Sequence, residues 1–343
     1  MATMKEVAKR AGVSIGTVSH VLSGTVPVSR KRRERVLTAV RNLRYHPNHI
    51  ARSLKVRSTR TLGMIISDIT NPFFSQMVRG AEDAALERGY LLLTFNSDDR
   101  EDREHQVLAV LRRRRVDGVL LVVAPSVKPP SHIRGALAGG IPIVCLDRLP
   151  PGIRTDSVTV DNVEGARHCI DHLIGLGHRR IGIITGSLSL QTARERLEGY
   201  RRALSLARIP VDSSLILEGD YRAESGYRLA RRLLAGRSRP TALFISNSMM
   251  GLGVLKALEE IGFECPRDIA LATFDDLPLT EAFRPHLTAV AQPAYLIGYQ
   301  GAELLIQRID SKKPRGRPVQ IRLPTKLIVR ESTGGSSGTL SSR

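Results

Sequence analysis

Residues 4–22 predict two short helices joined by a tight turn, and they read Met4-Lys5-Glu6-Val7-Ala8-Lys9-Arg10-Ala11-Gly12-Val13-Ser14-Ile15-Gly16-Thr17-Val18-Ser19-His20-Val21-Leu22. Thr3 and Glu6 match a capping box, in which each side chain satisfies a free backbone N–H of the first turn. Gly12 suits the left-handed conformation that ends many helices, and Ser14 is a typical N-cap for the second helix. The pattern is therefore that of a helix-turn-helix.

A third helix and a short linker helix are predicted next. Ser29 is a candidate N-cap, and apolar residues recur at helical spacing after it, at Val36, Leu37, Val40 and Leu43. Beyond Pro47, residues 48–56 can form a helix of nine residues that carries Leu54 and has little core of its own. Because isolated helices this short are marginal in water, we expect this helix to form only against a partner.

Positive charge is concentrated in the first 60 residues. They hold 14 Lys and Arg against two acids, Glu6 and Glu34, whereas the whole chain has a net charge of +19. The remaining 283 residues therefore contribute only +7. Such an asymmetry indicates a polyanionic partner at one end of the chain.

Length and composition are those of a protein with two or three domains. The 343 residues are 42% hydrophobic and 25% charged, which is enough to bury large cores. No apolar run approaches the roughly 20 residues of a membrane helix, and the first residues lack a signal-peptide pattern. Cys145, Cys169 and Cys265 have no metal or redox spacing, so we expect free thiols, no membrane partner and a cytoplasmic location.

From Thr61 onward, short apolar runs alternate with amphipathic stretches. The predicted strands are residues 62–67, 90–95, 119–123, 141–146, 181–185, 215–218, 242–246 and 269–274. The predicted helices are residues 73–88, 102–113, 162–176, 194–207, 225–234 and 249–261. This alternation predicts parallel sheets with right-handed crossovers, divided into two lobes near residue 160. The expected organisation is a headpiece (1–46), a hinge with a short helix (47–60), a two-lobed body (61–331) and a disordered tail (332–343).

Motifs spread over residues 3–331 resemble those of the LacI/GalR family of transcription regulators. The matching motifs are Val7-Ala8-x-x-Ala11-Gly12-Val13-Ser14-x-x-Thr17-Val18-Ser19, Tyr45-x-Pro47-Asn48-x-x-Ala51-Arg52-Ser53-Leu54, Asp68-Ile69-Thr70-Asn71-Pro72-Phe73-Phe74, Val116-Asp117-Gly118 and Arg194-x-Arg196-x-x-Gly199-Tyr200. The resemblance implies a small all-α headpiece that binds operator DNA, and an α/β body like the type I periplasmic sugar-binding proteins. It also implies three crossings between the lobes and a ligand in the cleft. The expected function is a homodimeric repressor that a small sugar releases from double-stranded operator DNA.

The second helix of a helix-turn-helix lies in the major groove, so its first residues are candidates for base contacts. Ile15 can contact a thymine methyl, Gly16 permits close approach, and His20 can bind a guanine or a phosphate. The candidate phosphate contacts are Lys5, Ser14, Thr17, Arg30 and Arg32. The resemblance assigns the hinge residues Arg52, Leu54 and Lys55 to DNA as well, with Leu54 wedged between base steps in the central minor groove.

Ten polar and aromatic residues are predicted to bind the effector, because they follow strands or begin helices at the cleft. They are Asn71, Phe73, Phe74, Asp147, Arg148, Arg196, Tyr221, Asn247, Asp275 and Gln292. Their polar groups suit vicinal hydroxyls, and their rings suit the apolar face of a sugar. The set is similar to the pocket of periplasmic ribose-binding proteins, with Tyr221 in place of phenylalanine, which favours a monosaccharide over a purine. Where the family commonly has Asn-Asp, this chain has Asn247-Ser248.

Other classes of function lack their sequence signals. No Gly-x-Gly-x-x-Gly follows the first strand, and no Gly-x-Ser-x-Gly or Walker-type loop is present, so neither an enzyme nor a cofactor is expected. His168 and His172 have no evident third ligand, so no metal is expected. A sugar-binding transport protein would have a signal peptide and no headpiece. The arginine run at 112–115 could touch DNA, although a helix end favours a solvated face. A corepressor that strengthens DNA binding stays an alternative to an inducer.

Overall fold

The computed structural model describes residues 2–23, 26–45, 58–236, 238–276, 284–311 and 316–334. The predicted hinge helix, with the candidate DNA contacts Arg52, Leu54 and Lys55, lies outside the described residues. The chain divides into two compact units, Met1–Thr59 and Arg60–Arg343. Each unit has its own core.

The first unit contains three short helices, which are α1 (Met4–Ala11), α2 (Ile15–Ser23) and α3 (Arg30–Asn42). Its core is formed by residues from all three helices and the segment after α3, namely Val7, Ala8, Ala11, Val18, Val36, Ala39 and Tyr45. The helix-turn-helix prediction is confirmed.

Local signals at the start of the chain form as predicted. Thr3 and Glu6 make both hydrogen bonds of a capping box at the start of α1. Gly12 ends α1 with φ 61°, and Thr17 N donates to Ser14 Oγ (3.1 Å) at the start of α2. Ser29 occupies the predicted N-cap position of α3, but its side chain makes no capping hydrogen bond. Of the apolar residues at helical spacing in α3, Val36 is buried and Leu37 is 38% exposed.

The second unit consists of two lobes, each built on one sheet. The strands of lobe 1 are β1 (Thr61–Ile66), β2 (Leu91–Asn96), β3 (Gly118–Leu121), β4 (Ile143–Leu146), β5 (Asp156–Val160) and β11 (Gln320–Leu323), and its helices are α5 (Pro72–Glu87), α6 (Glu101–Arg113), α7 (Ser131–Ala138) and α12 (Ala294–Asp310). The strands of lobe 2 are β6 (Ile181–Thr185), β7 (Ile216–Glu218), β8 (Ala242–Ile245), β9 (Ala270–Phe274), β10 (Thr288–Ala291) and β12 (Lys326–Ile328). Its helices are α8 (Asn162–Gly175), α9 (Gln191–Leu206), α10 (Ala223–Leu234) and α11 (Ser248–Ile261), with single turns η1 (Ser213–Leu215) and η3 (Glu331–Thr333).

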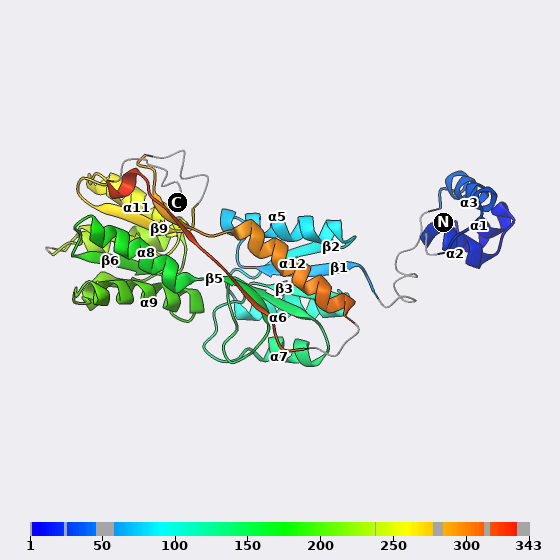
Figure 1. The fold of residues 1–343 in the computed structure, drawn as a ribbon, viewed down its shortest axis with the longest axis horizontal. Coiled ribbons are helices and arrows are strands. Elements are labelled where there is room, and N and C mark those ends of the chain that lie inside the picture. Colours follow the sequence, from blue (N-terminus) through cyan, green and yellow to red (C-terminus); the bar gives the residue numbers. More distant parts are fainter. Residues whose placement is uncertain are drawn as a thin grey trace. The chain divides into compact units, whose positions relative to one another are not determined.

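Both sheets have six strands, in the orders β11-β5-β4-β3-β1-β2 and β12-β10-β9-β8-β6-β7 (Figure 1). Every pair of strands is parallel except β10 with β12. The chain crosses between the lobes three times, after β5, after β10 and after β11. The predicted two-lobed α/β body is therefore confirmed. The predicted strands and helices are present within a few residues of their expected ends, and the sequence analysis missed β5, β10, β11, β12, α7 and α12.

The body continues past its predicted end at residue 331. Ser332 and Thr333 belong to η3 and are buried, so the prediction of a disordered tail from residue 332 is wrong at these positions. Ser332 Oγ donates to Leu271 O (2.7 Å) and accepts from Thr288 N (2.8 Å). These bonds form because buried backbone groups of lobe 2 need partners. Residues 335–343 lie outside the described residues.

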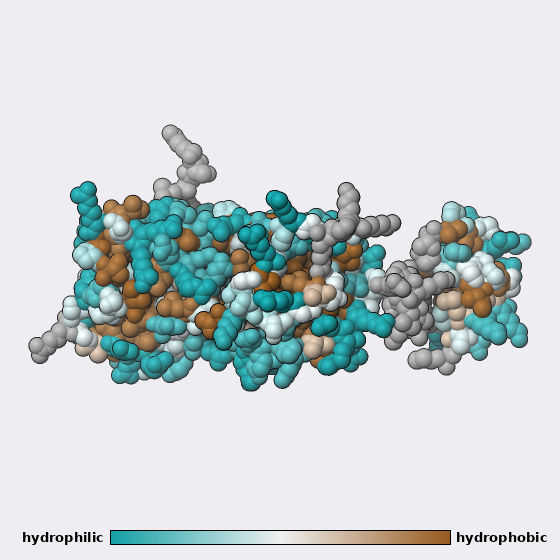
Figure 2. All heavy atoms as spheres, turned by 90° about the horizontal axis from the view of Figure 1, so that it is seen from below, coloured by the Kyte–Doolittle hydropathy of each residue, from teal (hydrophilic) through white to brown (hydrophobic). Residues whose placement is uncertain are grey.

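The surface seen in Figure 2 is mainly hydrophilic, with smaller hydrophobic areas between the charged side chains. Cys145, Cys169 and Cys265 are free thiols, as predicted. Among the helices that the structure describes, none is long and apolar enough to cross a membrane.

Helices α5 and α12 approach each other closely because each has a glycine that faces the backbone of the other helix. A Cβ atom on Gly80 would lie 2.0 Å from the Tyr295 carbonyl oxygen, and one on Gly298 would lie 1.8 Å from the Met77 carbonyl oxygen. Since α12 follows the second crossing, this contact fixes the returning chain on lobe 1.

We predict that Gly80→Ala lowers the free energy of unfolding of the body by about 1–3 kcal/mol, because the added methyl group must push backbone atoms apart. Urea unfolding followed by circular dichroism measures the change. Gly135→Ala is the matched control, since a Cβ there meets no atom within 4 Å, and in a helix it should stabilise by about 0.5–1 kcal/mol. Equal effects of the two substitutions would contradict the close helix contact.

Candidate functional site

A cavity of about 210 Å³ lies between the lobes, where the carboxyl ends of the strands meet. Lobe 1 contributes residues that follow β1, β2 and β4, and lobe 2 contributes residues that follow β7, β8 and β9. Residues of α9 and of the second crossing complete the lining. In open parallel sheets this edge is where ligands commonly bind.

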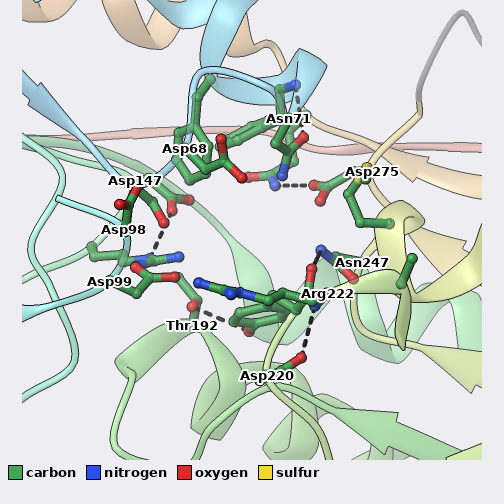
Figure 3. Close-up of a pocket in the computed structure, with 18 of the residues that line it drawn as sticks. Asp68, Asn71, Asp98, Asp99, Asp147, Thr192, Asp220, Arg222, Asn247 and Asp275 are labelled. Carbon is green, nitrogen blue, oxygen red and sulfur yellow. Dashed lines mark hydrogen bonds and ion pairs between the residues drawn. The ribbon is translucent and has the colours of Figure 1, made fainter. Parts of the chain in front are cut away.

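All ten residues predicted to bind an effector line this one cavity. They are Asn71, Phe73, Phe74, Asp147, Arg148, Arg196, Tyr221, Asn247, Asp275 and Gln292. Figure 3 shows the labelled residues of lobe 1 gathered opposite those of lobe 2. The sequence analysis missed Ser67, Asp68, Asp98, Asp99, Thr192, Asp220, Arg222, Ala223 and Met249, which also line it. Most of these residues follow predicted strands. The presence of polar residues after each strand was therefore the sequence feature from which they could have been predicted.

Five lining residues have a left-handed backbone conformation that side chains rarely adopt. Their φ angles are 53° for Asp98, 57° for Asp99, 62° for Asp147, 67° for Tyr221 and 70° for Asp275. Aspartate tolerates this conformation better than most residues, whereas a bulky tyrosine does not. Strained backbone gathers at functional sites, where the surrounding structure holds it.

The ring of Tyr221 lies over Gly186, where a Cβ atom would come within 2.1 Å of it. The Asn247 amide donates to the Tyr221 carbonyl oxygen (2.9 Å), and the Tyr221 hydroxyl lies 3.4 Å from Thr192 Oγ1. The glycine and these contacts hold the ring near the guanidinium groups of Arg148 and Arg196, each 6.0 Å from the ring centre.

Arg196 is buried and its guanidinium is held by backbone and side chain. Its Nε donates to Asn162 Oδ1 (2.9 Å) and its Nη1 donates to the Ser246 carbonyl oxygen (2.6 Å). The guanidinium also lies 3.8 Å from the ring centre of Phe274. Arg196 therefore joins the first crossing to the ends of β8 and β9, besides lining the cavity.

Arg148 is the buried cation of lobe 1. Its Nη1 donates to Asp99 Oδ1 (2.5 Å), and its Nε lies 3.4 Å from Asp147 Oδ2. Burial acts to raise the pKa of Asp99, but the charge and hydrogen bond of Arg148 outweigh it, so the pKa lies below its ordinary value. Asp99 is therefore ionised at neutral pH.

Two other carboxyl groups are less easily ionised. Burial raises the pKa of Asp147 to about 6, although Arg148 and Arg196 oppose the shift. Burial also raises the pKa of Asp275, which accepts a hydrogen bond from Gln292 Nε2. Groups with perturbed pKa values in a cleft are typical of functional sites.

Three lining residues have buried polar atoms without a hydrogen-bond partner among the described residues, namely Asp147 Oδ1, Arg148 Nε and Gln292 Oε1. An unsatisfied buried polar group costs about 1–3 kcal/mol. Ser248, which replaces the usual acid, also leaves its buried hydroxyl unpaired within the same described ranges. Asn247 nevertheless caps α11 by accepting from Met250 N (2.9 Å).

The headpiece residues predicted to contact bases lie on its surface. Ile15 is 49% exposed, and Gly16 and His20 are exposed on the same helix. Thr17 is half-buried, with its Oγ1 2.9 Å from Ser14 Oγ. Lys5, Arg30 and Arg32 are exposed as well, and Arg30 pairs with Glu34 (3.0 Å).

The histidine pair on α8 points to neighbours within the protein. His168 Nε2 lies 2.9 Å from the Arg167 guanidinium, and His172 Nε2 lies 3.0 Å from Thr333 Oγ1. Across the described ranges, no three His, Cys, Asp or Glu residues are grouped to hold a metal ion.

Two family models match the chain. The model of bacterial regulatory proteins of the lacI family matches residues 3–48, and that of the periplasmic binding protein-like domain matches residues 170–333. The HTH-type transcriptional repressor PurR of Haemophilus influenzae (strain PittEE) is 35% identical over 333 residues, which are 97% of this chain and 98% of the relative.

Two similar solved structures are those of a transcriptional regulator and a repressor. The complex of the transcriptional regulator CelR with cellobiose has a TM-score of 0.73 and 34% identity, and covers 97% of this chain and 100% of that one. The lac repressor dimer bound to operator and the anti-inducer ONPF has a TM-score of 0.86 and 28% identity, and covers 97% and 99%.

We predict that Asp147→Asn stabilises the protein at pH 7.5 but not at pH 4. The pKa of Asp147 in the folded state is about 6, above its ordinary value of 3.8. The protonated carboxyl group therefore makes its full contribution to the free energy of unfolding below pH 4. That contribution is lost as the pH rises through 6. The difference from the parent in free energy of unfolding should reach on the order of 3 kcal/mol at pH 7.5, since each pKa unit between 3.8 and about 6 corresponds to about 1.4 kcal/mol.

Urea unfolding of the two proteins at both pH values measures this difference. Comparison at each pH cancels the contributions of His172 and His178, whose pKa values burial lowers. An Asn variant that is less stable than the parent at pH 7.5 would contradict the desolvation of Asp147.

Proposed function

Because this chain belongs to the lacI family of bacterial regulatory proteins and is a DNA-binding transcriptional repressor, we propose that a monosaccharide bound in its cleft releases it from operator DNA. The observation that carries the proposal is the set of buried polar atoms on Asp147, Arg148 and Gln292 that lack hydrogen-bond partners among the described residues. They lie in a cavity small enough for one sugar ring.

The chemistry of the cavity favours a ligand with many hydroxyl groups. A hydroxyl can donate to Asp147 Oδ1 or Gln292 Oε1, and it can accept from Arg148 Nε. Six aspartates line the cavity, at positions 68, 98, 99, 147, 220 and 275. A purine base has few N–H donors to offer so many carboxylates, whereas a sugar has one at every hydroxyl. The rings of Phe73, Phe74 and Tyr221 provide apolar contact for the sugar face.

The headpiece is proposed to read DNA through the start of α2. Ile15, Gly16 and His20 are exposed there, and this end of a recognition helix faces base edges in the major groove. We further propose that Leu54 of the hinge wedges into the minor groove, with Arg52 and Lys55 on phosphates. Two chains would present two headpieces to a pseudo-palindromic operator.

Sugar binding controls this complex only if the sugar prefers one state of the body. The ligand contacts both lobes, so it favours their closed arrangement. We propose that closure changes the contact between the two chains, separates the two hinges and melts the hinge helices. A ligand that instead favours the DNA-bound arrangement would act as a corepressor.

The test begins with the duplex that the full-length chain selects from a randomised DNA pool. Thermal unfolding is then measured with D-ribose, with other monosaccharides and with purine bases. A sugar at 100 times its dissociation constant should add about 2.7 kcal/mol of stability, and the same sugar should weaken operator binding at least tenfold. Thermal stabilisation by purine bases alone would overturn the proposal of a sugar effector. Tighter operator binding in the presence of the ligand would identify that ligand as a corepressor.

We predict that Asp275→Asn abolishes the thermal response to the active sugar while leaving operator affinity within twofold of the parent. The carboxylate is buried in the cavity and far in sequence from the headpiece. Asp212→Asn is the control, because this half-buried carboxylate does not line the cavity. Loss of operator binding in the Asp275→Asn protein would assign Asp275 a structural role instead.

A further inference from the structure

The amino ends of all six strands of lobe 1 lie along one edge of its sheet. The register pairs Thr61 with Leu91, Leu62 with Gly118 and Val119 with Ile143. It continues through β5 to Gln320 at the start of β11. With about 4.8 Å between neighbouring strands, this edge is about 24 Å wide. It is also where the chain enters the body from the hinge, because Arg60 directly precedes β1.

Seven arginines lie in segments that directly precede the strands at this edge. They are Arg60, Arg112, Arg113, Arg114, Arg115, Arg154 and Arg317, and we call the surface that they form the linker edge. Among the described residues, no ion pair or side-chain hydrogen bond involves the guanidinium groups of Arg112, Arg113 and Arg114, and all three are exposed. Arg154 and Arg317 are exposed on loops before β5 and β11.

Two carboxylates at this edge are already engaged, and a third, Asp310 at the end of α12, is exposed and lies near Tyr90. Asp117 accepts a hydrogen bond from Arg60 N (3.0 Å), and Asp156 binds the Arg308 guanidinium through two hydrogen bonds (2.8 and 2.9 Å). At the opposite edge of the same sheet lie the cavity aspartates, such as Asp68 and Asp98. Lobe 1 therefore has several aspartates and Arg148 at the cleft, and the arginines of the linker edge at the side that the hinge enters.

Helix polarity accounts for part of this arrangement. Arg112 and Arg113 lie in the last turn of α6, where positive charge is favourable. Arg154 and Arg317 belong to separate loops before β5 and β11, so no helix end explains their place at this edge. The common property of these arginines is their position at the edge that the hinge enters.

Chain length limits how far this edge can lie from bound DNA. If the hinge helix ends at Val56 in the minor groove, only four peptide steps lead to Arg60. An extended chain covers at most about 3.6 Å per residue, so Arg60 lies within about 14 Å of that helix. Exposed charges separated by more than the Debye length, about 8 Å at physiological ionic strength, are largely screened, so a phosphate contact requires an arginine side chain to extend toward the DNA across part of this distance.

We propose that the linker edge is a second DNA-facing surface, which binds operator phosphates outside those contacted by the headpiece. This inference rests on the proposed docking of the hinge on DNA. The linker edge adds affinity without base preference, since phosphate contacts carry no sequence information. Its contribution also depends on hinge geometry, so melting of the hinge removes it together with the hinge contacts.

The test uses the full-length chain and the operator selected above. Arg112, Arg113 and Arg114 are replaced together by Gln, and affinity is measured by fluorescence anisotropy from 50 to 300 mM KCl. Each lost phosphate contact reduces the slope of log K against log salt by about 0.9, so we expect a reduction of about one to three. The control replaces Arg201, Arg228 and Arg232 of lobe 2, which are also exposed and carry the same charge, and should leave the slope within about 0.5 of the parent.

Leu54→Ala separates this inference from the function on which it rests. That variant should lose operator affinity while keeping the salt slope, because leucine neutralises no phosphate. Equal slopes for the parent and the linker-edge variant, with operator binding intact, would overturn the linker edge alone. Failure of the parent chain to select any duplex would overturn the proposed function. Equal reductions of the salt slope in the linker-edge variant and the lobe 2 variant would show that only the net charge of the protein matters, and this result would also overturn the proposal.

Discussion

The buried guanidinium of Arg196 is the interaction on which the site in lobe 2 depends. It joins Asn162 after the first crossing, the Ser246 carbonyl oxygen after β8 and the ring of Phe274 at the end of β9. It also opposes the cost of burying Asp147 and Asp275, whose pKa values burial raises. Removal of this cation would leave two desolvated carboxyl groups and two unpaired buried acceptors. One side chain thus joins the strands of lobe 2 and sets the electrostatics of the cleft.

The cleft is preorganised at the expense of stability. Five of its residues have left-handed backbone, and three carry buried polar atoms without partners among the described residues. A ligand that satisfies these atoms stabilises the arrangement of the lobes that buries it. Because the chain crosses between the lobes three times, a change in their angle is transmitted to lobe 1, from whose opposite edge the hinge leaves. In the proposed function, this route connects a small ligand to DNA through two edges of one sheet.

Most of the fold could be predicted from the sequence because its signals are local. The capping box at Thr3, the turn at Gly12 and the alternation of apolar runs with helices each depend on neighbouring residues. The elements that were missed, such as β5, β11 and β12, are strands of three to five residues with polar side chains among the apolar ones, so they contain no continuous apolar run. Burial of Ser332 was missed because its partners, Leu271 and Thr288, are distant in sequence.

The site could be predicted where a polar residue directly follows a strand, as Asp275 does after β9 and Asp147 does after β4. It could not be predicted where polar residues lie two or three positions beyond the strand, because the backbone decides which of them faces the cavity. Asp98 and Asp99 are such a case, because their left-handed φ angles cannot be predicted from the neighbouring residues. The role of Arg196 as a structural anchor also depends on partners at Asn162 and Ser246, which sequence spacing does not reveal.

In the proposed function, control of the hinge by a ligand in the cleft is the step that joins the two ends of this protein. Hydrogen–deuterium exchange of residues 47–56, measured in the operator complex with and without the active sugar, observes that step itself. These amides should exchange slowly on operator DNA and fast when the sugar is added, at protein concentrations where the headpiece stays on DNA. Release of the operator with no change in hinge exchange before dissociation would contradict ligand control of the hinge.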